Sequence, residues 1–279
     1  MYLRCWGSRG SLPVSGKQFD RYGGDTTCLE IRSKRGDVIV VDAGSGIRGL
    51  GLKLARSKVK KINLLFTHAH LDHIMGFPFF NPVYDRDIEI TIHGCSFHFP
   101  SYREILKGVM SAPYFPVDLE SVSAILRFSQ AGSQPFTVGG ITVRPIFLSH
   151  PNGGLGYRFE ENGASFVFLT DNELEFNHPG GQTFEEYAAF SQDADLLIHD
   201  AEFSLGDYPR NRSYGHSVFS DAVKLGIRAG AKRLGLFHHN RHRTDAQIDA
   251  MVERSKGIVK KGGARMECFA VSNSFEMTL

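Results

Sequence analysis

The sequence predicts an α/β (α+β) protein in which two β-sheets pack face to face with helices on their outer sides. Two observations support this prediction. Strand-like and helix-like segments alternate along all 279 residues, and the second half repeats the mixture of strands and helices found in the first. Hydrophobic residues make up 42% of the chain, which is enough for one large domain or two small ones. Because no low-complexity linker divides the halves, we expect residues 1–279 to form a single domain.

The first half contains five predicted strands. Each is a short apolar run bounded by polar residues or glycine, and the runs cover residues 2–7, 28–33, 37–44, 62–66 and 88–94. A glycine-rich turn at 44–51 leads into a helix that ends near Lys58. A short helix follows residue 73, and another helix is expected over 101–110.

The second half has the same character. Strands are expected over residues 141–149, 155–160, 165–170, 194–200 and 233–238. A hairpin turn at Asn162–Gly163 joins the second of these strands to the third. Helices are expected over residues 184–191, 217–231 and 244–261.

Residues 96–119 are rich in aromatic side chains and are interrupted by prolines. One interpretation is an aromatic lid that stacks a base above a binding site. The other is ordinary packing of these rings in the hydrophobic core. The sequence leaves both interpretations open.

The stretch THAHLDH, residues 67–73, holds three histidines and an aspartate in seven positions. The apolar run before it predicts a buried strand, so His68, His70, Asp72 and His73 lie where a strand ends and the chain turns outward. Imidazoles that converge beside a carboxylate at such a position indicate a metal site.

Further candidate ligands follow hydrophobic runs in the second half, namely His150, Asp171 and His238. Five imidazoles and two carboxylates are too many ligands for one tetrahedral zinc ion, but they suit two metal ions that keep open positions. Two ions about 3.5–4 Å apart can share a hydroxide and hold both the attacking and the leaving oxygen.

Simpler interpretations exist for single residues of this set. Taken alone, His150 or His238 would more often be a structural histidine, and Asp171 could cap a turn. The cluster at 68–73 favours the metal interpretation for the whole set. His239 adjoins His238, and because side chains alternate along a strand, only one of the two can readily face the metals.

The HAHLDH stretch matches the HxHxDH signature of the metallo-β-lactamase superfamily, and the later His, Asp and His follow in that family's order. The resemblance covers nearly the whole chain and implies a four-layer αββα sandwich. His70 stands where the diiron flavoprotein branch carries Glu, which disfavours that redox branch. The resemblance also implies two metal sites that share the bridging ligand Asp171: His68, His70 and His150 at one, and Asp72, His73 and His238 at the other.

A second resemblance, to the ribonuclease Z and cyclic phosphodiesterase branch, rests on LLIHDAEF at 196–203 and on GHS at 215–217. It implies that Asp200 stands where ribonuclease Z has Glu and that His216 falls on its catalytic His. Together with Asp72, these are the candidate catalytic residues. The segment 7–31 also resembles this branch, with backbone positioning as the simpler interpretation of its role.

The chain departs from both best-known members of that branch. It has no long Gly/Pro-rich basic arm of the kind with which ribonuclease Z grips tRNA. It also lacks the clustered cysteines that hold a structural zinc in the phosphoribosyl cyclic phosphodiesterase.

Charge favours a phosphodiester as substrate. Two divalent ions less two carboxylates leave +2, and a bridging hydroxide leaves +1, which suits a mono-anionic phosphodiester. Asp200 could hold the His216 ring so that it protonates the leaving oxygen. The sequence therefore predicts a metal-dependent phosphodiesterase for a small cyclic or nucleotide-like phosphodiester, with zinc as the expected metal and manganese or iron as alternatives. The competing interpretations are a lactonase-type hydrolase and a metal-containing binding or sensor module without turnover.

Composition indicates the setting in which the protein works. The formal net charge is +2, with both signs interspersed, so long nucleic acid is not expected as a partner. Four dispersed cysteines without a CxxC pair, and an N-terminus without a long apolar core, predict a cytoplasmic protein. No run approaches the ~18 apolar residues that cross a membrane, so no membrane partner is expected. The sequence leaves a homodimer open.

Overall fold

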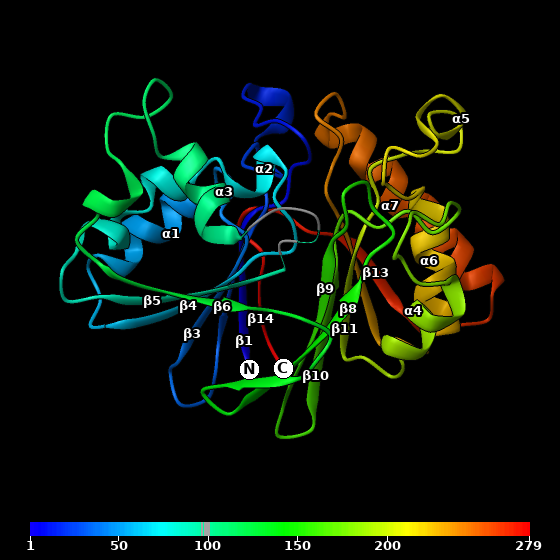
Figure 1. Ribbon diagram of the computed structural model, residues 1–279. Coiled ribbons are helices and arrows are strands. Elements are labelled where there is room, and N and C mark those ends of the chain that lie inside the picture. The colour runs from blue at the N-terminus through cyan, green and yellow to red at the C-terminus, as the bar shows by residue number, and fades with distance from the viewer. Residues whose placement is uncertain (96, 98–100) are drawn as a thin grey trace.

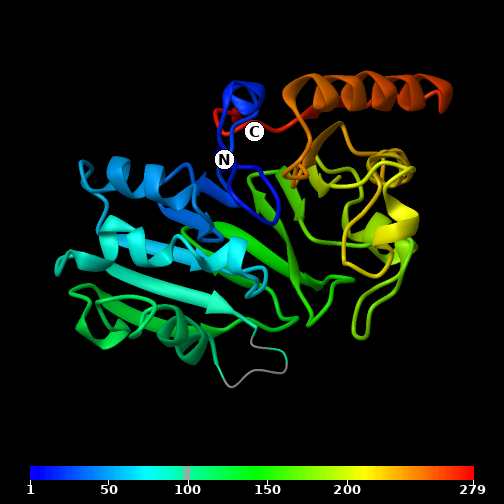
Figure 2. The ribbon, with the colours of Figure 1, turned by 90° about the horizontal axis from the view of Figure 1, so that it is seen from above.

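The computed structural model describes residues 1–95, 97 and 101–279. In this part of the chain, two mixed β-sheets lie face to face, and helices cover the outer side of each (Figures 1 and 2). The predicted α/β class and the four-layer αββα arrangement are therefore confirmed. None of the described helices is long and apolar enough to cross a membrane.

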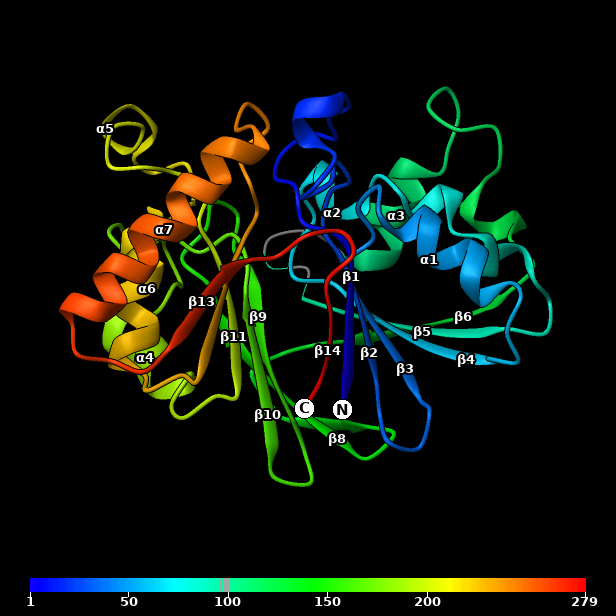
Figure 3. The same cartoon turned by 180° about the vertical axis from the view of Figure 1, so that it is seen from behind.

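The first sheet has the strand order β14-β1-β2-β3-β4-β5-β6. Its strands are β1 (Tyr2–Gly7), β2 (Cys28–Arg32), β3 (Val38–Val41), β4 (Lys61–Leu65), β5 (Glu89–Gly94), β6 (Ile125–Gln130) and β14 (Glu276–Thr278). The four strands β3 to β6 run parallel to one another. Strand β14 pairs with β1, so the last strand of the chain lies beside the first (Figure 3).

The second sheet has the strand order β13-β12-β11-β10-β9-β8-β7. Its strands are β7 (Phe136–Val138), β8 (Ile141–Phe147), β9 (Leu155–Glu161), β10 (Ala164–Leu169), β11 (Leu196–Asp200), β12 (Arg233–Phe237) and β13 (Glu267–Ala270). Strands β10 to β13 are parallel. Because β9 is antiparallel to both of its neighbours, β8 points in the same direction as β10.

Helices form the two outer layers. They are α1 (Ile47–Leu54), α2 (Leu71–Ile74) and α3 (Tyr102–Val109) on the first sheet, and α4 (Phe184–Phe190), α6 (Phe219–Arg228) and α7 (Asp245–Lys261) on the second. The one-turn helix α5 (Tyr208–Asn211) lies in the loop between β11 and α6. Short 3-10 helices occupy Lys17–Phe19, Phe77–Phe79, Asn81–Tyr84 and Leu119–Ser121. Capping boxes at Thr183 and Thr244 begin α4 and α7 by satisfying their free backbone amides.

Three hydrophobic cores hold the four layers together. Ile39 and Phe159 belong to the core between the sheets, Leu64 to the core under the first helical layer, and Leu236 to the core under the second. Strand β3 is covered on both faces, and all four of its residues are buried. A strand in this position must be apolar throughout, which explains its sequence VIVV.

Parallel strands place their carboxyl ends at the same edge of a sheet, and ligand sites commonly form there. In this fold, the loops that follow β3, β4, β8, β10, β11 and β12 all leave from such ends. The predicted ligands lie on these loops or immediately after the strands.

Several details differ from the sequence-based expectations. The short helix expected after residue 73 begins at Leu71, and strands β6, β7, β13 and β14 were not expected. The strand predicted over 37–44 ends at Val41, because Asp42 adopts a positive φ of 61° and turns the chain. The helix expected to end near Lys58 ends at Leu54.

The segment 96–119 contributes in part to the core. Residues 96 and 98–100 lie outside the described residues, whereas the segment from Ser101 onward contains α3. The Tyr102 ring stacks on Phe66 at 4.9 Å between centroids, and Leu106 is fully buried. This helix therefore serves core packing, and the aromatic lid stays a prediction.

Candidate metal centre

Seven residues that the sequence predicts as ligands converge between the two sheets. The first sheet supplies those that follow β4 or lie on α2, and the second sheet supplies those that follow β8, β10 and β12. In chain order they are His68, His70, Asp72, His73, His150, Asp171 and His238, and the structure brings them into two adjoining groups of donor atoms.

The first group consists of the histidines His68, His70 and His150. One ring nitrogen from each lies within 4.8 Å of the others, and His70 Nδ1 is 3.0 Å from His150 Nε2. Burial holds the pKa of His68 and of His150 well below the usual value, and it also lowers the pKa of His70. Neutral imidazoles whose nitrogens face one another offer lone pairs to a cation.

The second group contains Asp72, His73, Asp171 and His238, with one donor atom from each within 4.8 Å of the rest. Asp171 links the two groups, because its oxygens face different partners. Its Oδ1 lies 3.3 Å from His73 Nε2 and 3.4 Å from His238 Nε2. Its Oδ2 lies 3.6 Å from His68 Nε2 in the first group.

Residues around the centre orient the histidine rings. Asp42 accepts a hydrogen bond from His73 Nδ1 at 2.8 Å, and Glu202 accepts one from His238 Nδ1 at 3.0 Å. The Gly215 carbonyl accepts from His150 Nδ1 at 2.9 Å. Each bond uses Nδ1 and leaves Nε2 directed at the centre, as is usual for histidines that bind metals.

Sequence reasoning missed the roles of Asp42 and Glu202. Asp42 directly follows the apolar run VIVV, and a carboxylate at a strand end was the available signal. Glu202 lies within the stretch LLIHDAEF beside Asp200, but nothing in that pattern indicates that it contacts His238. The N-terminal segment also reaches the centre, because the backbone amide of Ser11 donates to Asp72 Oδ2 at 2.8 Å.

Three residues at strand ends have left-handed backbone conformations. Asp42, Asp171 and His238 have φ values of 61°, 53° and 54°. Non-glycine residues rarely adopt such values, and they do so preferentially at functional sites. Here Asp171 and His238 bring donor atoms to the second group, and Asp42 bonds to His73.

His216 and Asp200 lie next to the second group. His216 Nδ1 is 2.9 Å from Asp200 Oδ2, and the ring stacks on that of His238 with centroids 4.7 Å apart. Burial opposes a charged ring, but the carboxylates of Glu202 and Asp200 raise the pKa of His216 to about 9. The two carboxylates therefore favour the protonated form of His216.

The structure separates the two adjacent histidines at the end of β12. His238 lies in the second donor group, whereas His239 Nε2 donates to the Val271 carbonyl at 2.8 Å. Burial lowers the pKa of His239 to about 3. Of this pair, only His238 faces the centre.

The donor set fits divalent metal ions. Within the described chain, the buried Nε2 atoms of His68 and His73 have no hydrogen-bond partner. Burial lowers the pKa of His73, but Asp171 and Asp72 together raise it well above the usual value. Asp171 likewise raises the pKa of His238 against the effect of burial. The carboxylates thus require positive charge at this place, and a bound cation can replace the two protons.

Fold and donor set together define a protein of the metallo-β-lactamase class. The family model described as a beta-lactamase superfamily domain matches residues 38–239, and the chain belongs to this family. The family membership that the HAHLDH signature predicts is thereby confirmed.

Similar proteins cover nearly the whole chain. Ribonuclease Z from Haloarcula marismortui is 24% identical over an alignment of 300 positions that covers 92% of this chain and 91% of that protein. Among solved structures, the metallo-beta-lactamase fold protein YhfI from Bacillus subtilis has a TM-score of 0.74 at 18% identity, covering 99% of this chain and 98% of that one. A diphosphatase of the PhnP family has a TM-score of 0.70 at 17% identity, covering 100% and 97%. Both structures share the fold.

Proposed function

We propose that the protein is a metal-dependent phosphodiesterase that hydrolyses a small cyclic or nucleotide-like phosphodiester. The observation that supports this best is the 2.9 Å contact between His216 and Asp200 beside the donor cluster. It provides a proton donor for a poor leaving group, which phosphodiester cleavage needs. The names of two similar proteins, a ribonuclease Z and a PhnP-family diphosphatase, agree with phosphorus–oxygen bond cleavage.

Two metal ions form part of the proposal. One would be held by His68, His70 and His150, the other by Asp72, His73 and His238, and Asp171 would contact both. Imidazole-rich donor sets suit zinc, with manganese or iron as alternatives. Bound in this way, the ions would polarise the phosphate and lower the pKa of water.

His216 and Asp200 would act at the leaving group. The oxygen of a water molecule, which gives up one proton to the solvent, would form a new bond to phosphorus while the bond to the leaving oxygen breaks. The protonated His216 then gives its proton to that oxygen, with Asp200 holding the ring through Nδ1. Asp72 is the third catalytic candidate, because its carboxylate lies in the same centre between His73 and His238.

The alternatives differ in their need for His216. A lactonase-type hydrolase would use the same donors, but neither it nor a sensor module without turnover accounts for the HDAEF and GHS motifs that carry Asp200 and His216. RNA is a further alternative substrate, because one relative is named ribonuclease Z. The net charge of +2 favours a small substrate. A homodimer and a cytoplasmic location stay predictions of the sequence.

Substitution of His216 tests the proposal. His216→Ala should keep its metal content and lose about 10²–10⁴-fold in kcat on phosphodiesters with alkyl leaving groups, the usual range for general acid catalysis. The loss should be much smaller with p-nitrophenyl esters, because nitrophenolate departs without a proton. Rates are measured across a series of leaving-group pKa values, and metal content by atomic spectroscopy. Equal losses across the series would remove His216 from this role and reopen the lactonase alternative.

A further inference from the structure

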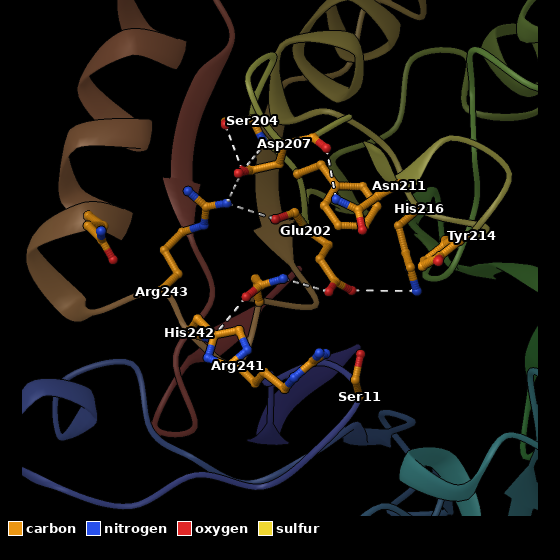
Figure 4. A pocket seen from close by; sticks show the side chains of 13 residues that line it. Ser11, Glu202, Ser204, Asp207, Asn211, Tyr214, His216, Arg241, His242 and Arg243 are labelled. Carbon is orange, nitrogen blue, oxygen red and sulfur yellow. Dashed lines mark hydrogen bonds and ion pairs between the residues drawn. The ribbon is translucent and has the colours of Figure 1, made fainter. Parts of the chain in front are cut away.

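A polar cavity of about 650 Å³ adjoins the proposed metal centre. Three residues of its wall contact the centre directly, and one of them is Glu202, whose carboxylate accepts from His238 Nδ1 at 3.0 Å. Ser11 donates its backbone amide to Asp72 at 2.8 Å, and His216 stacks on His238. Figure 4 shows Arg241 and Ser11 along one side of this cavity, with His216 and Tyr214 across from them. The cavity therefore offers space to a substrate at the proposed centre, on the side of His216.

Most charged side chains of the cavity wall already have partners. Arg243 Nη2 donates to Asp207 Oδ2 at 2.9 Å and to the Glu202 carbonyl at 3.1 Å. The Glu202 carboxylate accepts from Asn240 Nδ2 at 2.8 Å and from His238 Nδ1 at 3.0 Å. These contacts pair both carboxylates and the Nη2 atom of Arg243 with neighbours inside the protein.

Arg241 differs from its neighbours. Among the residues that the structure describes, its guanidinium makes no ion pair and no side-chain hydrogen bond, although it lines the cavity. The loop that carries it is nevertheless held in place. The fully buried Arg9 donates through Nη1 to the carbonyls of Asn240 at 3.2 Å and of Arg243 at 2.9 Å, on either side of Arg241. Arg241 is thus an unpaired cation on an anchored loop.

We propose that this cavity is a subsite for a second phosphate group of the substrate and that Arg241 binds that group. The proposal rests on the proposed phosphodiesterase function. Because His216 lines the same cavity, the second phosphate belongs to the part of the substrate that leaves. The planar guanidinium donates paired hydrogen bonds to phosphate oxygens. Asn211 and Tyr214 add polar groups to the wall.

Two matched aryl esters test the subsite on the metal-loaded enzyme. Methyl 4-(phosphonomethyl)phenyl phosphate carries a second anionic group on its leaving phenol, and methyl 4-methylphenyl phosphate lacks it. Wild-type enzyme should prefer the first by about 10- to 100-fold in kcat/KM, as expected for hydrogen bonds to a charged group. Arg241→Ala should abolish this preference and keep the rate on the second ester, whereas Arg241→Lys should retain part of it. Arg210→Ala, which removes an exposed arginine outside the cavity, should leave the preference intact.

Binding of the two product phenols, measured by titration calorimetry, gives a readout without turnover. The wild type should bind 4-(phosphonomethyl)phenol at least tenfold more tightly than 4-methylphenol, and Arg241→Ala should bind both alike. An equal wild-type rate on the two esters, or an unchanged preference in Arg241→Ala, overturns the subsite while leaving the phosphodiesterase function in place. No hydrolysis of either ester overturns the proposed function itself. A third ester, in which the phosphonate itself carries one methyl ester, distinguishes two sources of the second phosphate. If the Arg241-dependent preference is weaker for this ester than for the free phosphonate, the subsite binds a terminal phosphate. If the two preferences are equal, it binds a phosphate within a nucleotide chain.

Discussion

Asp171 lies where its two carboxylate oxygens reach different donor groups. Oδ1 is 3.3 Å from His73 Nε2, and Oδ2 is 3.6 Å from His68 Nε2. Asp171 lies just after the end of β10 and has a left-handed φ of 53°. Such a conformation costs roughly 1–3 kcal/mol, so a favourable interaction must offset it, and ligation of two cations is such an interaction.

Replacement of Asp171 should therefore affect both metals. We expect Asp171→Ala to lose both ions on dialysis, since in the proposed centre this one carboxylate would anchor both cations. Metal content per chain, determined by atomic spectroscopy, measures the effect. Asp195→Ala is the control, because Asp195 precedes β11 at the opposite edge of the sheet and pairs with Lys232. Retention of one ion at native affinity would show that Asp171 is a ligand of a single metal.

The two histidines at the end of β12 should respond differently to substitution. His238→Ala removes a donor from the second group and should lower the metal content. His239→Ala should keep the metals and destabilise the fold by about 1–3 kcal/mol, the cost of leaving the buried Val271 carbonyl unpaired. Urea unfolding and metal analysis of both variants test this. Loss of metal from His239→Ala alone would reverse the assignment.

Sequence could predict the donors of the centre but not the groups that orient them. The seven donors follow apolar runs and match a known signature, so their convergence could be predicted from the sequence. The contacts of Asp42 with His73 and of Glu202 with His238 depend on how separate loops pack. The choice between His238 and His239 also needed the backbone, because the left-handed φ at His238 departs from the regular alternation of a strand.

At the scale of elements, one buried carboxylate organises the loop that carries His216. Glu173 accepts hydrogen bonds from Tyr208 Oη at 2.7 Å and from the backbone amides of Ser213 and Gly215, each at 2.8 Å. It also accepts from His178 Nε2 at 2.9 Å. These bonds fix the turn that ends at Gly215.

The turn at Gly215 positions two residues of the site, His150 and His216. Its carbonyl accepts from His150 Nδ1 at 2.9 Å, and His216 follows it in the chain. Gly215 has a φ of 91°, and a Cβ there would lie 2.1 Å from His150 Nδ1. Glycine is therefore required at this position for both conformation and space.

Glu173→Gln should loosen this loop without removing any proposed ligand. The new amide group would point NH₂ at hydrogen-bond donors, which costs about 1–3 kcal/mol of folding stability for each polar group left unsatisfied. We also expect a lower affinity for the metal at His150 and a lower kcat. Thermal unfolding, metal titration and kinetics measure these effects. Glu175→Gln, which changes an exposed carboxylate two residues away, is the matched control. Identical stability and metal affinity in Glu173→Gln would contradict this role.

Whether an element could be predicted depended on its burial. The central strand β3 is buried throughout and reads as an apolar run. Strand β6 lies at the edge of the first sheet, and none of its six residues is buried, so it was not predicted. Strand β14 has three residues and forms by pairing with β1 at the other end of the chain. No local pattern contains that information.

At the scale of the whole molecule, the proposed metal centre joins the two halves of the fold. His68 to His73 come from the first sheet and its loop, whereas His150, Asp171 and His238 follow strands of the second. The donor atoms therefore converge only when the four layers have packed. A cation that needs donors from both halves binds the folded state and not the unfolded chain.

Metal removal should consequently lower the thermal stability of both halves of the fold. At a free metal concentration 1,000 times the dissociation constant, selective binding to the folded state contributes ~4 kcal/mol. For a chain of this size, this corresponds to a shift in Tm of roughly 10 °C. Chelated and zinc-reconstituted protein are compared by scanning calorimetry, with circular dichroism to establish that both are folded at 20 °C. The variant Asp171→Ala is the control, and its Tm should change little with added zinc because both proposed sites are weakened. Equal Tm values for the metal-free and metal-loaded wild type would contradict a centre that joins the two sheets.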